Sequence, residues 1–223
     1  MRRVVITGCN RGIGLELAKC FQKKGDAVIG ICRQSSNELD AIADQVLSGI
    51  EITNPMDVQK VSEELSDHSV DILIHNAGIL TKETLDELDD AAFQRIEAQF
   101  QVNAIAPLRL THACLSALKK GATVVLITSR MGSIADNTSG RMYGYRLSKA
   151  ALNMMGKSLA HDLEPQEISV AILHPGYVQT GMTNYNGNMS AEESARLLVE
   201  RIEEWDLSKT GQFMHASGES LPW

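Results

Sequence analysis

A tyrosine and a lysine four residues apart, Tyr145 and Lys149, are the pair in this sequence best suited to chemistry. In a helix that spacing places both side chains on one face, one turn from each other. A free phenol has a pKa near ~10, and an adjacent ammonium favours the phenolate and lowers that pKa. Tyr145 is therefore a candidate acid/base. Ser129, which ends an apolar strand-like run, is a candidate to hold the substrate oxygen by a hydrogen bond.

Such a group suits hydride transfer to a carbonyl, because the reduced oxygen must gain a proton and an oxidised alcohol must lose one. Two neighbours compete for these roles. Tyr143 has Leu147 four residues later, which offers no charge, so we expect Tyr143 to form a wall of the substrate pocket. Ser133 is a rival for Ser129. Ser129 is preferred because the end of a strand fixes a hydroxyl better than a loop does.

A glycine-rich segment near the start of the chain is typical of a dinucleotide site. Gly8, Gly12 and Gly14 lie between a predicted strand at 3–7 and a helix that continues through Phe21. Glycines at such a turn let the backbone approach a pyrophosphate, and the helix N-terminus supplies unpaired N–H groups. The alternative is a turn that only packs the helix on the strand.

The end of the second predicted strand bears on the choice of dinucleotide. A protein that prefers NAD usually has an acidic residue here for the ribose 2′-hydroxyl, but this chain has Cys32 followed by Arg33. Arg11, in the glycine segment, could converge with Arg33 on a 2′-phosphate through forked hydrogen bonds. We therefore expect NADP(H), the alternative being that both arginines are solvated surface charges.

Strand and helix patterns alternate along the whole chain, which predicts an α/β fold. Helical spacing is expected at 91–98, 108–118, 145–163 and 191–204, the last with Ser190 as its N-cap. The expected strands cover residues 3–7, 27–32, 50–53, 70–75, 122–128, 168–173 and 212–215. This order indicates a single domain over residues 1–223, a Rossmann-type doubly wound parallel sheet of about seven strands with helices on both faces.

Composition excludes several other classes of protein. The net charge of -7 and the pI near 5.4 argue against binding to nucleic acid or to an anionic membrane. No apolar run is long enough to span a bilayer, and the first residues pass directly into a strand, so a cytoplasmic protein is expected. The four cysteines lack the paired spacing of a metal site, and no metal is expected.

Taken together and in this order, the glycine segment, Asn76-Ala77-Gly78, Ser129, the Tyr145/Lys149 pair and the Pro175-Gly176 turn resemble the short-chain dehydrogenase/reductase family from residue 4 to about 213. The resemblance implies a catalytic set of Asn103, Ser129, Tyr145 and Lys149. Asn103 would distort its helix and hold a water that links Lys149 to solvent, although a plain helix boundary is the alternative. His75 replaces an asparagine of the family motif and is read as a packed residue.

The resemblance also implies the cofactor contacts. An Asp-Val pair, Asp57-Val58, would border the adenine after the third strand, and Val178 and Thr180 would meet the nicotinamide end. The full expected set is Thr7, Gly8, Asn10, Arg11, Gly12, Ile13, Gly14, Arg33, Asp57, Val58, Asn76, Ala77, Gly78, Tyr145, Lys149, Pro175, Gly176, Val178 and Thr180.

Within the family, the residues around Tyr145 and the C-terminal Gly218–Trp223 segment are similar to the C-factor-like and carbonyl-reductase-like branch. This similarity implies an NADP(H)-dependent reductase for a small carbonyl or alcohol substrate. A non-catalytic NADP(H)-sensing regulator on the same fold is the alternative. The helices at 108–118 and 145–163 correspond to faces that pair relatives, so a homodimer or homotetramer is expected.

Overall fold

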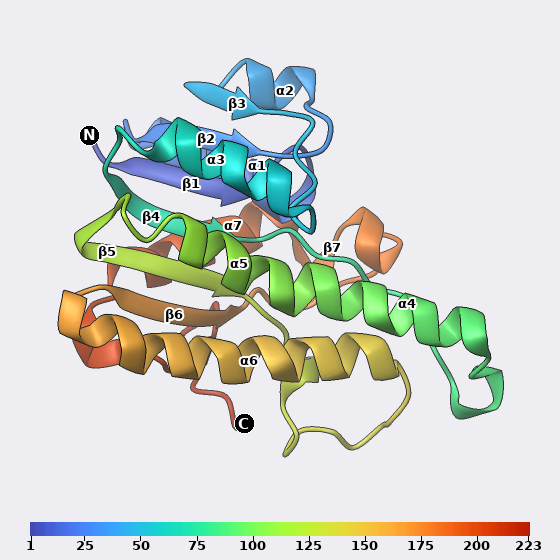
Figure 1. The fold of residues 1–223 in the computed structure, drawn as a ribbon. Helices are drawn as coiled ribbons and strands as arrows, with labels where there is room; N and C mark the ends of the chain where they lie inside the picture. Colours follow the sequence, from blue (N-terminus) through green and yellow to red (C-terminus); the bar gives the residue numbers. More distant parts are fainter.

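A seven-stranded, all-parallel sheet forms the centre of the molecule, which a computed structural model describes over all of residues 1–223 (Figure 1). Its strand order is β3-β2-β1-β4-β5-β6-β9. The strands are β1 (Arg3–Thr7), β2 (Ala27–Ile31), β3 (Gln45–Leu47), β4 (Val70–His75), β5 (Leu118–Ile127), β6 (Ser169–His174) and β9 (Phe213–His215). The expected Rossmann-type doubly wound sheet is confirmed, and its carboxyl ends all lie at one edge.

Helices cover both faces of this sheet. On one face α1 (Gly12–Lys23) and α7 (Ala191–Glu203) share a core of 22 buried residues with the strands. On the other, α3 (Pro55–Leu65), α5 (Ala106–Ala113) and α6 (Tyr143–Leu163) share a core of 25. The remaining regular elements are α2 (Asn37–Asp40), α4 (Asp90–Phe100) and a short pair of strands, β7 (Val178–Gln179) and β8 (Met189–Ser190). None of the helices combines the length and apolar composition that crossing a membrane requires.

Two of the expected elements are misplaced. The strand expected at 50–53 is wrong, because Gln45–Leu47 pairs with β2 instead, and Asn54 then caps α3 with Pro55 in its first turn. The helix expected at 108–118 ends at Ala113, and Leu118 already pairs with Val70 at the start of β5. A turn at 114–117 reverses the chain without glycine or proline, so the sequence carried no stop signal there.

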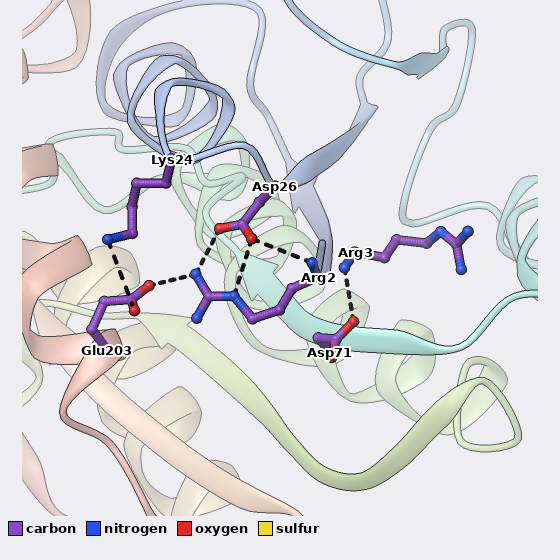
Figure 2. Close-up of polar contacts among 6 residues, drawn as sticks. All are labelled: Arg2, Arg3, Lys24, Asp26, Asp71 and Glu203. Atoms are coloured by element: carbon purple, nitrogen blue, oxygen red, sulfur yellow. Dashed lines mark hydrogen bonds and ion pairs between the residues drawn. The ribbon is translucent and has the colours of Figure 1, made fainter.

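A cluster of charges ties elements together where β1 begins, at the edge opposite the carboxyl ends (Figure 2). The Arg2 guanidinium donates to the Asp26 carboxylate, with its Nη2 2.6 Å from Oδ2, and to Glu203 of α7 at 2.6 Å. Lys24 lies 3.9 Å from Glu203, and the Arg3 amide donates to Asp71 at 2.8 Å. These contacts join β1, β2, β4 and α7 far from the candidate site described next.

Candidate active site

The loop between β1 and α1 packs backbone to backbone against the segment that follows β4. Gly8 has a φ of 66°, and a Cβ on it would lie 2.8 Å from the Ala77 Cα. A Cβ on Gly14 would lie 2.4 Å from both the Asn76 Nδ2 and the Gly8 carbonyl oxygen. Side chains at these positions would force the loop away from β4. Glycine is therefore required for this close approach.

Asn76 and Thr7 lock this contact with hydrogen bonds. The Asn76 amide nitrogen donates to the carbonyl oxygens of Thr7, at 3.0 Å, and Gly8, at 2.9 Å. In return, the Thr7 hydroxyl accepts from the backbone amides of Asn76 and Ala77, both at 3.1 Å. The glycine loop and the Asn76-Ala77-Gly78 segment thus form one rigid edge above β1 and β4.

The N-terminus of α1, at the centre of this edge, has the features that suit a bound anion. Arg11 occupies the N-cap position without a side-chain cap, and no acidic residue lies in the first turn. Gly12 follows with a φ of 57°. The first-turn N–H groups are free of protein caps and of nearby negative charge, which is the condition for holding a pyrophosphate. The expected glycine loop residues lie in the loop before α1, as Asn10 does, or in the first turn of the helix, as Ile13 does.

The side chains of Ser129, Tyr145 and Lys149 meet beyond the end of β5. The Ser129 hydroxyl lies close enough to the Tyr145 phenol to lower its pKa, and it caps the short turn that follows by accepting from the Met131 amide. The Lys149 ammonium lies 5.8 Å from the centre of the Tyr145 ring and donates to the Ile127 carbonyl at 2.9 Å. All three residues are buried. A proton donor, a hydroxyl and a cation thus share one small region.

Asn103 lies in a π-helical turn, Gln101–Ile105, between α4 and α5. Its side chain accepts from the Ile79 amide at 2.8 Å and donates to the Ile79 carbonyl at 2.9 Å and to the Ser148 hydroxyl at 3.0 Å. The Asn103 Oδ1 would be only 3.1 Å from a Cβ on Gly78. The helix is distorted at this residue, as the resemblance implied, and Asn103 joins the segment after β4 to α6.

This arrangement of a glycine loop, an Asn-Ala-Gly segment and a Ser/Tyr/Lys group agrees with a comparison of the sequence against protein families. The model described as "short chain dehydrogenase" matches residues 2–191. The chain belongs to the short-chain dehydrogenase family.

Within the short-chain dehydrogenase family, similar proteins fall in the expected branch. The 1-hydroxy-2-glutathionyl-2-methyl-3-butene dehydrogenase of Rhodococcus sp. (strain AD45) is 35% identical over 100% of both chains. The C-signal protein of Myxococcus xanthus is 40% identical over 69% of this chain and 93% of its own. The crystal structure of an NADPH-bound carbonyl reductase from chicken fatty liver has a TM-score of 0.89 at 27% identity, covering 100% of this chain and 99% of that one. The resemblance to the C-factor-like and carbonyl-reductase-like branch is confirmed.

Burial controls the ionisation of the pair found in this short-chain dehydrogenase. Burial raises the pKa of Tyr145 to about 12, and the neighbouring Ser129 hydroxyl lowers it only in part. The pKa of Lys149 falls to about 8 because its ammonium is buried without a carboxylate partner. The phenol pKa is therefore raised and not lowered as expected, because desolvation is the largest effect on it.

The turn after β6 reaches across to the glycine loop. Pro175 is fixed through its carbonyl by the Ser194 hydroxyl of α7 at 2.8 Å, and Gly176 follows with a φ of 94°. Val178 is buried in β7, and the Thr180 methyl would be 3.6 Å from a Cβ on Gly12. The expected residues of the nicotinamide end thus lie beside those of the pyrophosphate end.

The adenosine end differs from the expectation in one place. Asp57 and Val58 lie in the first turn of α3 and not at a strand end; Asp57 accepts from Lys60 and from the Glu51 amide, and Val58 belongs to the core. The segment beside the carboxyl end of β2 is instead 49–52, whose first two amides donate to the Arg33 and Cys32 carbonyls. Glu51 lies 3.6 Å from Arg33, as an ion pair at the surface. The sequence signal that would have found Glu51 is its place just before the Asn54-Pro55 helix start.

Two other sequence interpretations, of His75 and Ser133, concern packed residues. His75 is buried and hydrogen-bonded to the Thr111 hydroxyl at 2.8 Å, and burial lowers its pKa to about 3, which confirms a packing role. The Ser133 hydroxyl caps the Asp136 amide at 3.1 Å. Gly132 lies against the α6 backbone, where a Cβ would be 2.7 Å from the Lys149 carbonyl carbon. Ser129 and not Ser133 therefore lies beside Tyr145, and Gly132 fixes the turn between the two serines.

Proposed function

We propose that this short-chain dehydrogenase is an NADP(H)-dependent oxidoreductase that transfers a hydride between the nicotinamide and a carbonyl or alcohol carbon of a small molecule. The observation that carries the proposal is the shared burial of the Ser129 hydroxyl, the Tyr145 phenol and the Lys149 ammonium, with the ammonium 5.8 Å from the centre of the phenol ring. A proton-donating phenol beside a second hydroxyl suits a single substrate oxygen, which gains negative charge as the carbonyl is reduced.

In the proposed reduction, the Ser129 hydroxyl orients the carbonyl oxygen and Tyr145 gives it a proton. NADPH, when bound, supplies the hydride. Lys149 would return a proton to Tyr145 and regain one from solvent through a water held by Asn103, because the Lys149 pKa of about 8 allows its ammonium to lose and regain a proton near neutral pH. The high pKa of Tyr145 keeps the phenol protonated, which favours the reductive direction.

The preference for NADP(H) over NAD(H) is part of the proposal and depends on Arg11 and Arg33. Both side chains are exposed at the edge where the ribose of a dinucleotide would lie. The similar carbonyl reductase from chicken fatty liver is described as NADPH-bound. Glu51 pairs with Arg33 and would hold its guanidinium in place at this edge. An Arg11→Ala, Arg33→Ala double variant should lose the preference, measured as the NADPH/NADH ratio of kcat/KM, and an unchanged ratio would overturn this assignment.

The test of the activity is NADPH oxidation with a panel of aldehydes, ketones and quinones. Tyr145→Phe should lower kcat by about 10²- to 10⁴-fold while NADPH binding, measured by fluorescence titration, stays within about twofold. Tyr143→Phe is the matched control: as a residue of the pocket wall it should change KM at most and keep kcat. Full activity in Tyr145→Phe would refute the mechanism. Binding of NADPH without turnover of any compound by the wild type would favour the sensing regulator instead.

We also propose that two or four copies associate through α5 and α6. Leu108, Leu147 and Met154 are exposed apolar side chains on these helices, and exposed apolar patches mark association surfaces. Light scattering coupled to size exclusion should give a dimer or tetramer, and a monomer at micromolar concentration would contradict this.

A further inference from the structure

The first turn of α6, which carries Tyr145, begins in an unusual way. The three residues before it, Gly140, Arg141 and Met142, all have left-handed backbone angles, with φ values of 61°, 58° and 52°. Left-handed angles cost free energy in residues other than glycine and persist only where the surroundings enforce them. Met142 is the N-cap residue, and its side chain caps nothing. Some other group must hold this end of the helix.

Glu83, about sixty residues earlier in the sequence, is that group. Its carboxylate Oε2 accepts from the Gly144 amide at 3.2 Å, the position where an N-cap side chain would normally bond. Its backbone carbonyl accepts from the Met142 amide at 2.8 Å. Glu83 is 1% exposed, so these bonds form away from water. A carboxylate near a helix N-terminus is also favoured by the helix dipole.

The other carboxylate oxygen is held from the opposite side. Glu83 Oε1 accepts from the Thr81 hydroxyl at 2.5 Å and from the Gln99 amide nitrogen at 3.0 Å. Gln99 is fully buried on α4, and its side-chain oxygen Oε1 accepts from the Thr81 backbone amide at 3.0 Å. A Cβ on Gly144 would be 2.2 Å from the Gln99 nitrogen, so only glycine lets α6 approach this closely. The carboxylate cannot move without breaking several bonds.

The segment that carries Glu83 is anchored at its other end by Asn103. Both polar atoms of the Asn103 side chain bond to Ile79, and its nitrogen also donates to Ser148, whose hydroxyl donates to the Tyr145 carbonyl. Residues 79–83 are therefore connected to α6 at two points, at Gly144 through Glu83 and at Ser148 through Asn103. These two points lie on either side of Tyr145 in the sequence. Glu83 fixes the start of the helix, and Asn103 fixes its second turn.

We propose that Glu83 is a positioning residue for the reaction: it caps α6 from a distant loop and so places the Tyr145 phenol against the Ser129 hydroxyl. This inference rests on the proposed function, since it assigns Glu83 to the same reacting site. Loss of the carboxylate would let the left-handed entry and first turn relax. Small displacements of a reacting group cost about 100-fold in rate, so the effect should fall on kcat and not on cofactor binding.

The experiment compares Glu83→Ala, Glu83→Gln and Glu87→Ala with the wild type. Glu87 is an exposed acid on the same segment that accepts only from Thr84. Three quantities are measured on full-length protein whose folding is checked by circular dichroism. They are the steady-state kinetics of carbonyl reduction, the NADPH Kd, and amide hydrogen exchange in peptides covering 141–147.

Glu83→Ala should lower kcat about 100-fold with the NADPH Kd within about twofold, and exchange at 141–147 should accelerate at least about tenfold. Glu83→Gln keeps one oxygen for the Gly144 amide and should recover most of the lost kcat, whereas Glu87→Ala should match the wild type. A Glu83→Ala variant with wild-type kcat, or one whose exchange at 141–147 is unchanged, would overturn the assignment.

The two proposals fail in different ways. If the wild type reduces no carbonyl compound, the proposed function fails, and the exchange data alone then decide whether Glu83 holds the first turn of α6. If the wild type is active through Tyr145 but Glu83→Ala loses only overall stability and keeps its kcat, the inference about Glu83 fails by itself.

Discussion

Replacing Lys149 with methionine should make the apo protein more stable at neutral pH while it abolishes turnover. Methionine has a similar length and no charge to bury. The pKa of Lys149 falls from its ordinary value of 10.5 to about 8 in the folded protein because burial disfavours the ammonium. The unfolded chain therefore holds this proton more tightly than the folded one, and the ammonium destabilises the folded state in full below about pH 8.

The size of the effect follows from that difference. A pKa difference of about 2.5 corresponds to about 3 kcal/mol at about 1.36 kcal/mol per pKa unit. Methionine also loses the hydrogen bond from the Lys149 ammonium to the Ile127 carbonyl, which costs about 1 kcal/mol. The expected net gain for Lys149→Met is about 2 kcal/mol at pH 7. The penalty disappears as pH rises from 8 to 10.5, so the gain should vanish near pH 10.

Urea unfolding of the wild type and the variant at pH 7 and pH 10 measures this change, because the other ionisable groups are common to both proteins. Lys157→Met, an exposed lysine on the same helix, is the matched control and should change stability by less than about 0.5 kcal/mol at both pH values. A stability difference between Lys149→Met and the wild type that is the same at both pH values would refute the reasoning.

Two further substitutions test the parts of the fold that carry the site. Gly14→Ala should weaken NADPH binding by at least about tenfold in a fluorescence titration, since overpacking of this kind costs about 1–3 kcal/mol, whereas Gly181→Ala, with open space around its Cβ, should bind normally. Asp26→Ala should lower the unfolding free energy by about 2 kcal/mol at pH 7 through the lost bonds to Arg2. Burial raises the pKa of Asp26, but Arg2 lowers it further, to below the ordinary 3.8; the stabilisation is therefore present above about pH 4 and lost as pH falls through the lowered pKa. Equal unfolding curves for wild type and Asp26→Ala at pH 7, or normal NADPH binding by Gly14→Ala, would contradict these expectations.

The sequence predicted most of the fold because its signals were local. Buried parallel strands are continuous β-branched runs, and β1, β4 and β6 lie within two residues of where such runs were found. The edge strand β3 was missed because it has only three half-buried residues, so its pattern is weak and the neighbouring Ile50–Thr53 run looked more strand-like. That error led us to expect Asp57 just after a strand, whereas it lies in the first turn of α3.

The candidate site was predicted from the spacing of residues along the chain. Spacing can identify only residues that share one helix or strand, or that end successive strands. The Tyr145/Lys149 pair, Ser129 and the glycine loop fall in that class. The direction of the Tyr145 pKa shift was not predicted, because it depends on how completely the folded protein buries the phenol. The role of Glu83 was not predicted either, because its partner Gly144 lies 61 positions away and no motif links the two residues.

The anchoring of the reacting groups from both sides has a consequence for altering substrate range. Gly132 fixes the turn after Ser129 against the α6 backbone, and Glu83 fixes the start of α6. Between them, residues 134–139 are largely exposed, with Ile134 81% exposed. Insertions or randomised residues in this interval would reshape the rim of the site while the serine and tyrosine hydroxyls keep their separation. A library confined to this loop would therefore vary substrate specificity while the reacting groups stay in place.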